Sequence, residues 1–259
     1  MKQILIIGIG AGNPDHMTVQ AIDALNRADL LFIPVKGDDK RMLVDIRRDI
    51  CQRFVTGKAK PEIEFIVPDR AGKDDTAAYR MAVGDWHGQL AEIYENLLSR
   101  HVADGQSVAI LVWGDPGLYD STIRVVERIV ARGNVTIEYN VIPGITSIQA
   151  LAARHRIPLN DIGRPVRITT GRRLGDDLGG DGETTIVMLD SRNAFANIDP
   201  EMEIFWGAYV GTDAEIMIAG KLGDVADEIA TVRAEARARH GWIMDSYLLR
   251  KPGRDDDDI

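Results

Sequence analysis

This sequence of 259 residues contains a single cysteine, Cys51. One thiol cannot close an intrachain disulfide, and it leaves no second thiolate for a structural zinc site. We therefore expect a protein of a reducing compartment, the cytoplasm, that binds no metal. Long apolar runs are missing as well. No run approaches the roughly 20 residues of a membrane span, so we expect no membrane partner.

Positive charge is in deficit. The chain has 31 Lys and Arg against 40 Asp and Glu, which gives a formal net charge of -9. Clustered Lys and Arg drive binding to nucleic acid and to anionic membranes, so this balance argues against both as general partners. An anionic ligand has to find a local basic patch on this chain.

Several catalytic motifs are absent too. The sequence has no P-loop, no GxSxG and no HExxH, and its five histidines lack the spacing of metal ligands. We expect His87 and His101 to be solvated on a surface helix. The turn GIGAGN at residues 8–13 invites a dinucleotide-binding interpretation, but Asn13 stands where the third glycine of GxGxxG belongs. This departure argues against an NAD-binding domain.

What is present is enough apolar sequence for a packed core, 45% of the residues. In the first half, short β-branched runs alternate with helical patterns, which is typical of βαβ units with a parallel sheet. The predicted strands cover 3–9, 28–35, 62–67, 107–112 and 135–142, and the predicted helices cover 17–27, 41–53, 76–101, 122–132 and a segment from 147 that ends before Pro158. Gly84 is a candidate break in the third helix, and Gly133 a left-handed cap of the fourth. The elements up to residue 142 form the first predicted domain, 1–145, and the helix from 147 belongs to the second.

The second half of the sequence has a different pattern of glycines and apolar runs. Residues 171–182 contain five glycines and predict a mobile loop. Short strands follow at 184–189, 203–210, 215–218 and 242–249, with a helix over 224–239. Strands spaced this closely indicate antiparallel pairing, so we predict a mixed-sheet second domain over 146–250. The segment 251–259 is a charged tail that we expect to be disordered.

Two loops of the first half have the same ingredients. WGDPGLYDST at residues 113–122 follows one buried strand, and PGITS at 143–147 follows the next. Ligands of open parallel sheets bind beyond the carboxyl ends of the strands, where glycine lets the backbone approach closely. Asp115 can be a turn-former or a ligand contact, and Asp120 or Ser121 can cap a helix. We predict that the two loops bind a small polar ligand.

Five segments in order carry a family resemblance: GIGAGNPDHMT, WGDPGLYDST, VIPGITSIQALAARHRIPLN, TTIVMLD and YVGTDAEIMIAGKL. The chain resembles the tetrapyrrole (corrin and porphyrin) methylases nearly end to end. The resemblance implies two α/β domains with the active site in the trough between them, and a homodimer. It also implies S-adenosylmethionine as cofactor and S-adenosylhomocysteine as product. Where the wider family has GxGPG, this chain has Ala11 in place of the proline.

Within the family, the segments ITTGRRL, WGAYVGT and GWIMDSYLLR resemble the members that methylate C-1 of precorrin-5 and release acetate. Other readings are open. One is methylation of a different corrin or porphyrin carbon, of the diphthamide precursor, or of ribosomal RNA, which the charge disfavours. Another is a tetrapyrrole-binding module without catalysis, which would have no use for both loops together.

The resemblance also assigns residues. It implies cofactor contacts at Gly10, Ala11, Trp113, Gly114, Asp115, Leu118, Thr146, Ser147, Met188, Leu189, Ala208, Gly211 and Thr212. Acetate release requires water to attack a ketone carbon, which needs a general base and an oxyanion stabiliser. Candidates for this role are Asp15, His16, Tyr119 and Asp120, although the two aspartates can equally be helix caps. For the carboxylates of the substrate we predict a basic rim of Arg124, Arg154, Arg172 and Arg173.

Overall fold

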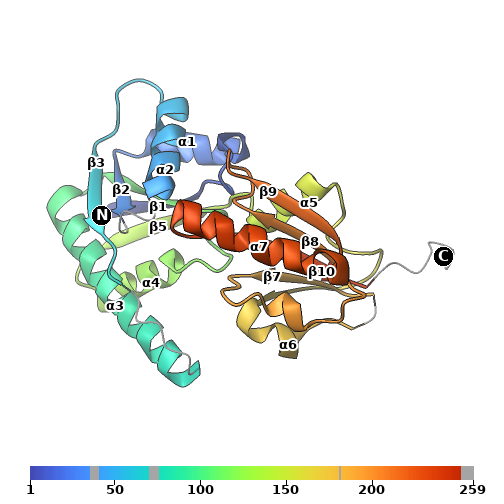
Figure 1. Ribbon diagram of the computed structural model, residues 1–259. Coiled ribbons are helices and arrows are strands. Elements are labelled where there is room, and N and C mark those ends of the chain that lie inside the picture. The colour runs from blue at the N-terminus through green and yellow to red at the C-terminus, as the bar shows by residue number, and fades with distance from the viewer. Residues whose placement is uncertain (36–40, 70–75, 181, 252–259) are drawn as a thin grey trace. The chain divides into compact units, whose positions relative to one another are not determined.

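The structure is a computed structural model that describes residues 1–35, 41–69, 76–180 and 182–251. The chain divides into two compact units, Met1–Ile145 and Thr146–Ile259 (Figure 1). Of the predicted tail 251–259, all but Lys251 lies outside the described residues. No helix in the described part of the chain is both long enough and apolar enough to cross a membrane.

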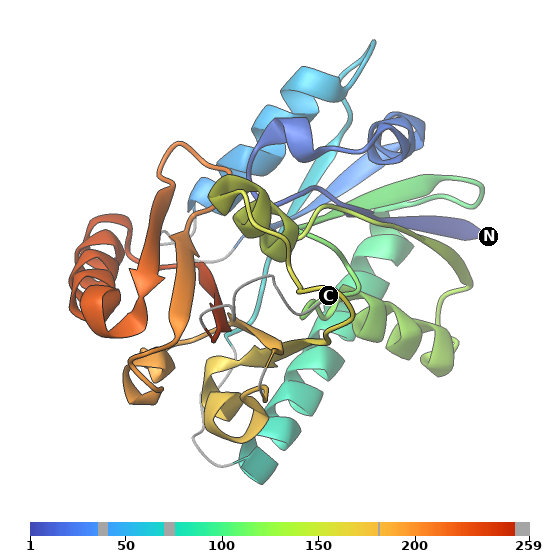
Figure 2. The ribbon, with the colours of Figure 1, turned by 90° about the vertical axis from the view of Figure 1, so that its right-hand side faces the viewer.

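The described residues of the first unit form a five-stranded parallel sheet, as the βαβ pattern predicts (Figure 2). Its strands are β1 (Lys2–Gly8), β2 (Leu30–Val35), β3 (Glu62–Ile66), β4 (Ser107–Val112) and β5 (Ile137–Ile142), in the order β3-β2-β4-β1-β5. The central strands β1 and β4 are buried on both sides, which explains their unbroken apolar sequence.

Helices cover both faces of this sheet. They are α1 (Val19–Arg27), α2 (Arg41–Phe54), α3 (Thr76–His101) and α4 (Thr122–Arg132). Because side chains alternate along a strand, Ile4 and Ile6 of β1 pack in the cluster with α3 and α4, whereas Leu5 and Ile7 pack with α1 and α2. Figure 1 shows the two helix pairs on opposite sides of the strands.

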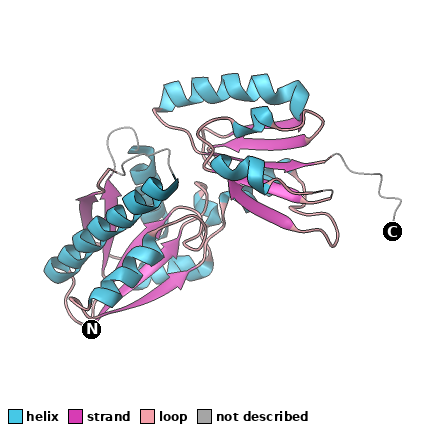
Figure 3. Ribbon diagram, turned by 90° about the horizontal axis from the view of Figure 1, so that it is seen from below, coloured by secondary structure: helices cyan, strands magenta, loops and turns pink. Residues whose placement is uncertain are grey.

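The second unit has a mixed sheet, also as predicted (Figure 3). Its strands are β6 (Val166–Thr170), β7 (Thr184–Met188), β8 (Glu203–Ala208), β9 (Ile216–Lys221) and β10 (Asp245–Arg250), in the order β6-β7-β10-β8-β9. Only the β6–β7 pair is parallel among the described strands of this sheet. Helix α5 (Ser147–His155) contacts Phe205 through His155, and α7 (Leu222–His240) lies on the other face, behind Trp206.

Three predictions about elements are wrong, and one strand was missed. The segment 171–182 begins with a 3₁₀ turn (Gly171–Arg173) and α6 (Leu174–Asp177), held down by Leu174, which is 1% exposed. The strand β6 just before it was not predicted at all. Helix α3 runs through Gly84 without a break, and His87 on it is buried rather than solvated. The predicted cap at Gly133 is confirmed, with φ 68°.

Candidate functional site

Three glycines meet at the carboxyl edge of the first sheet. Gly8 ends β1, Gly114 follows β4 and Gly144 follows β5. A Cβ added to Gly144 would overlap the carbonyl oxygen of Gly114 and lie 2.8 Å from the backbone carbon of Gly8. Gly10 and Gly114, both predicted cofactor contacts, exchange two backbone hydrogen bonds of 3.3 and 2.8 Å. The three loops are therefore packed backbone against backbone, which only glycine permits.

Asp115 joins the two loops WGDPGLYDST and PGITS. Its Oδ1 accepts the backbone N–H of Gly117 at 2.7 Å, and its Oδ2 accepts that of Gly144 at 2.9 Å. The first bond is the turn-forming role, and the second ties WGDPG to PGITS. Asp115 is half-buried, and a carboxylate that accepts an N–H on each oxygen forms strong, directional hydrogen bonds. It therefore clamps the two loops together.

A cavity of about 290 Å³ opens in the first unit beside the same loop. Trp113, Tyr119 and Asp120 from the loop line it, together with Arg47 from α2 and Tyr94 from α3. Tyr119 has φ 51°, a left-handed conformation that is uncommon outside glycine and that concentrates at functional sites. The sequence does not indicate Arg47 or Tyr94 as site residues, because each lies inside a helix without any motif around it.

The four candidate bases do not lie together. Asp15 is exposed, lies in a short 3₁₀ helix (Pro14–His16) and forms an ion pair with Arg53. His16 packs against Gly10. Tyr119 and Asp120 line the cavity, whereas Asp15 and His16 are not part of its wall. Asp120 also accepts the N–H of Thr122 at 2.7 Å, which confirms a capping role for its Oδ1.

In the second unit, three of the predicted cofactor contacts lie close together beside the start of β10. β10 runs antiparallel to both neighbours and pairs Ser246 with Met188 on one side and Gly207 on the other. The hydroxyl of Ser147, at the start of α5, lies 3.3 Å from that of Ser246. Met188, Ala208 and Ser147 therefore lie around one short stretch of β10.

The backbone is unusual at this edge. Leu189, directly after β7, has φ 55°, and Tyr209, directly after β8, has φ 49°. Leu189 is 60% exposed, although it is a large apolar residue. These two positions follow the strands that flank β10, and non-glycine residues in this conformation concentrate at functional sites.

The remaining predicted contacts have local roles. Thr146 is the N-cap of α5 in a capping box with Gln149. Gly211 donates its N–H to Glu215 at 2.8 Å, and the Thr212 hydroxyl donates to the carbonyl of Tyr209 at 2.8 Å. Ala11 and Leu118 lie in the first unit, buried and half-buried respectively.

The predicted arginine rim has different partners at each position. Arg124 donates to the carbonyl of Asp120 at 3.1 Å, beside the cavity. Arg154 forms an ion pair with Glu215, and Arg173 forms one with Asp177 at 2.9 Å. Arg172 lies in the 3₁₀ turn before α6. The Arg173–Asp177 pair is largely exposed, and exposed ion pairs contribute little stability.

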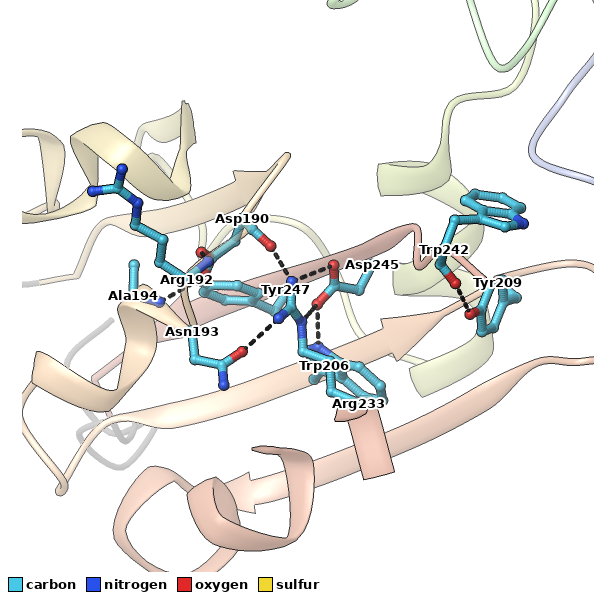
Figure 4. Close-up of polar contacts among 10 residues, drawn as sticks. All are labelled: Asp190, Arg192, Asn193, Ala194, Trp206, Tyr209, Arg233, Trp242, Asp245 and Tyr247. Atoms are coloured by element: carbon cyan, nitrogen blue, oxygen red, sulfur yellow. Dashed lines mark hydrogen bonds and ion pairs between the residues drawn. The ribbon is translucent and has the colours of Figure 1, made fainter. Parts of the chain in front are cut away.

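A buried polar network that the sequence did not indicate lies at the carboxyl end of β7 (Figure 4). Arg233 of α7 forms an ion pair with Asp245 at 2.8 Å, and Trp206 donates its indole N–H to the same carboxylate at 3.0 Å. Burial raises the pKa of Asp245, and the Arg233 guanidinium opposes that rise. Breaking such a pair leaves a buried charge without compensation.

The same network fixes the loop after Leu189. Asp190 accepts the hydroxyl of Tyr247 at 2.7 Å and the backbone N–H groups of Arg192 at 2.9 Å and Ala194 at 2.7 Å. Arg233 donates to the carbonyl of Asp190. The position of Leu189 is thereby determined by residues from α7 and β10, far away in the sequence.

Comparison with known proteins agrees with this architecture. Residues 3–226 match the family Tetrapyrrole (Corrin/Porphyrin) Methylases. The chain belongs to this family. A protein named precorrin-6A synthase [deacetylating], from Sinorhizobium sp, is 58% identical over 252 residues, which cover 97% of this chain and 96% of that protein.

Solved structures of tetrapyrrole methylases and related proteins have the same fold. The cobalamin-synthesis-related protein CobF from Corynebacterium diphtheriae is 33% identical, with a TM-score of 0.83 over 97% of this chain and 99% of that one. A uroporphyrin-III C-methyltransferase from Thermus thermophilus, solved with S-adenosyl homocysteine, has a TM-score of 0.57 at 18% identity, over 96% and 92% of the two chains. The family and fold expected from the sequence are confirmed. Among the described residues of this methylase, no cluster of three or more His, Cys, Asp or Glu side chains could hold a metal ion.

Proposed function

We propose that this chain is an S-adenosylmethionine-dependent methyltransferase that methylates C-1 of precorrin-5 and releases acetate, giving precorrin-6A. The observation that carries the proposal is the 58% identity, over 97% of the chain, to a protein named precorrin-6A synthase [deacetylating]. The architecture supports it, because both glycine-containing loops stand at the carboxyl edge of a parallel sheet.

The residues at the two strand edges fit this cofactor. Met188 and the exposed Leu189 offer apolar surface to an adenine ring, and the backbone of the WGDPG loop offers polar groups to an amino-acid moiety. We propose that Trp113, Gly114 and Leu118 hold the amino-acid part, with Ser147, Ala208, Gly211 and Thr212 completing the set. When bound, S-adenosylmethionine supplies an activated methyl group. The chain then has to position an electron-rich carbon and exclude water, which explains why it needs no nucleophile of its own.

For acetate release we propose Asp120 as the general base. Of the two candidate aspartates, Asp120 lines the cavity, whereas Asp15 is engaged by Arg53. Oδ1 of Asp120 caps α4, and no described residue donates to Oδ2, so the carboxylate retains an oxygen for a water molecule.

Mass spectrometry after incubation with S-adenosylmethionine and precorrin-5 tests the function. We expect the gain of one methyl group with the loss of one acetyl group, and one equivalent of acetate in the medium. Methyl gain without acetate would indicate a different ring carbon, and no methyl transfer would overturn the proposal. Asp120→Asn should lower acetate release at least about a hundredfold, as loss of a general base does, while Asp15→Asn, the matched control, should not.

We also propose a homodimer, as the family resemblance implies. Light scattering on the purified protein should then give twice the chain mass of 28.6 kDa. A mass of one chain at micromolar concentration would contradict it.

A further inference from the structure

Arg47 is a buried cation in the wall of the cavity. It is 8% exposed, and in the described part of the chain no carboxylate lies within ion-pairing distance of it. Buried charges in proteins are nearly always paired or hydrogen-bonded, because removing a charge from water is costly. Desolvation lowers the pKa of this guanidinium, and the negative charge of Asp120 in the same wall partly restores it. The exception therefore needs a physical reason.

Two backbone contacts hold Arg47 in place but do not neutralise it. Its Nε donates to the carbonyl of Leu111 at 3.0 Å, and its Nη1 donates to the carbonyl of Leu43 at 2.7 Å. The pairing of β2 with β4 ends at Phe32 and Ile110, and Pro34 further along β2 has no N–H. Strand β2 therefore offers no donor to the carbonyl of Leu111, and Arg47 donates to it instead. A guanidinium has five N–H groups, so most of its donors are not used by these two bonds.

The hydroxyl of Tyr94 is a second hydrogen-bond donor in the wall of the same cavity. Tyr94 is 6% exposed, and its hydroxyl makes no hydrogen bond to any of the residues that the structure describes. Its ring packs between Phe32, at 6.2 Å, and Phe65, at 5.1 Å, which holds the hydroxyl in place. Burial raises the pKa of Tyr94, so the hydroxyl keeps its proton and acts as a donor. Because Tyr94 lines the cavity, a ligand there can accept a hydrogen bond from this hydroxyl.

We propose that this cavity is a carboxylate-binding site in which the guanidinium of Arg47 and the hydroxyl of Tyr94 both donate to the bound carboxylate. An acceptor group with two oxygens and one negative charge satisfies both donors and neutralises the buried cation. The volume of about 290 Å³ accommodates a short carboxylic-acid side chain as well as acetate. The choice of a carboxylate over other anions rests on the proposed function, whose substrate carries carboxylate arms and whose reaction releases acetate.

Acetate itself is the probe. Saturation-transfer NMR on the methyl signal of sodium acetate, titrated into the full-length protein at constant ionic strength, should give a dissociation constant on the order of millimolar, the range expected for one small anion. Acetamide, the neutral isostere, should not compete. If acetamide binds as tightly as acetate, the proposal is overturned.

Variants locate the site. Arg47→Gln should weaken acetate binding about tenfold or more, since a charge-assisted bond is lost, and Tyr94→Phe about three- to tenfold, since one neutral donor is lost. Arg48→Gln is the matched control, because Arg48 lies on the same helix but pairs with Glu62 and Glu64. If Arg47→Gln fails to fold, Tyr94→Phe decides alone. A folded Tyr94→Phe variant that binds acetate as the unchanged protein does would overturn the proposal.

Turnover with S-adenosylmethionine and precorrin-5 separates the two sources of the carboxylate. If a substrate arm binds here, Tyr94→Phe should raise the KM for precorrin-5 with little change in kcat. If released acetate binds here, KM should stay the same and product inhibition by acetate should weaken. No change in either property would overturn the assignment. Acetate binding through Arg47 without turnover of precorrin-5 would instead refute the proposed function and leave the carboxylate site standing.

Discussion

Among single residues, Gly144 is packed most tightly at the candidate site. It touches the backbone of Gly8 on one side and of Gly114 on the other, and a side chain there would meet backbone atoms rather than a flexible side chain. Gly84 in helix α3 differs, since a Cβ there would have one neighbour, the guanidinium of Arg128 at 3.9 Å. The two glycines therefore provide a matched comparison.

We expect Gly144→Ala to destabilise the protein by about 1–3 kcal/mol, the usual cost of overpacking. It should also weaken binding of S-adenosylhomocysteine, because the loops at the strand ends would be forced apart. Gly84→Ala should be neutral or stabilise by up to about 1 kcal/mol, since alanine favours a helix. Urea unfolding followed by circular dichroism measures both changes. Equal stabilities for the two variants would contradict the packing argument.

Asp115 makes a second prediction at this scale. In Asp115→Asn, the amide nitrogen would face either the N–H of Gly117 or that of Gly144, and two donors cannot bond to each other. We expect a loss of about 1–3 kcal/mol of unfolding free energy, as for a buried donor left without an acceptor. Asp23→Asn, on the exposed face of α1, is the control. Thermal unfolding of both variants would refute a clamp at Asp115 if their midpoints coincided.

At the scale of elements, helix α5 is fastened to its sheet by a titratable contact. His155, its last residue, has its Nε2 3.0 Å from the carbonyl of Trp206, and its ring packs edge-on against Phe205. Desolvation lowers the pKa of His155 below its usual 6.5, although the bond to Trp206 and the charge of Glu215 partly oppose this. The neutral ring is thus the form that fits the folded state.

The unfolded chain therefore binds more protons than the folded chain between the lowered pKa and 6.5. By linkage, this contribution to stability is complete above pH 6.5 and is lost as the pH falls through the lowered pKa. We expect the unfolding free energy to decline from pH 7 to pH 5, and His155→Gln to remove part of that slope. His101→Gln, exposed at the end of α3, should leave it as it is. An unchanged slope in His155→Gln would rule this account out.

At the scale of the whole molecule, the cofactor decides between two classes of protein. Binding of S-adenosylhomocysteine to the folded chain alone should add about 2.7 kcal/mol of stability at a hundred times its dissociation constant. NAD should add nothing, because Asn13 replaces the third glycine of the dinucleotide pattern. Thermal shift titrations with both compounds test this. Stabilisation by NAD alone would contradict the proposed function.

The local pattern of the sequence determined most of the architecture. Apolar runs bounded by glycine and proline predicted β1, β4 and the parallel sheet, because those signals are contained within a few residues. Strand β6 was missed because its edge position leaves residues such as Arg167 exposed, so no apolar run exists to be found. The turn after it was taken for a loop because its anchor, the burial of Leu174, depends on packing and not on glycine content.

For the candidate site as well, some features follow from the local sequence and others only from tertiary packing. The sequence by itself determined which loops end the buried strands and, through family resemblance, which residues of those loops to consider. Only the tertiary structure decided that Asp115 clamps two loops, that Arg233 pairs with Asp245, and that Arg47 and Tyr94 line one cavity. The first two contacts join residues 29 and 12 positions apart in the sequence. Burial is a property of the packed chain, so no local pattern shows which charges and hydroxyls are buried.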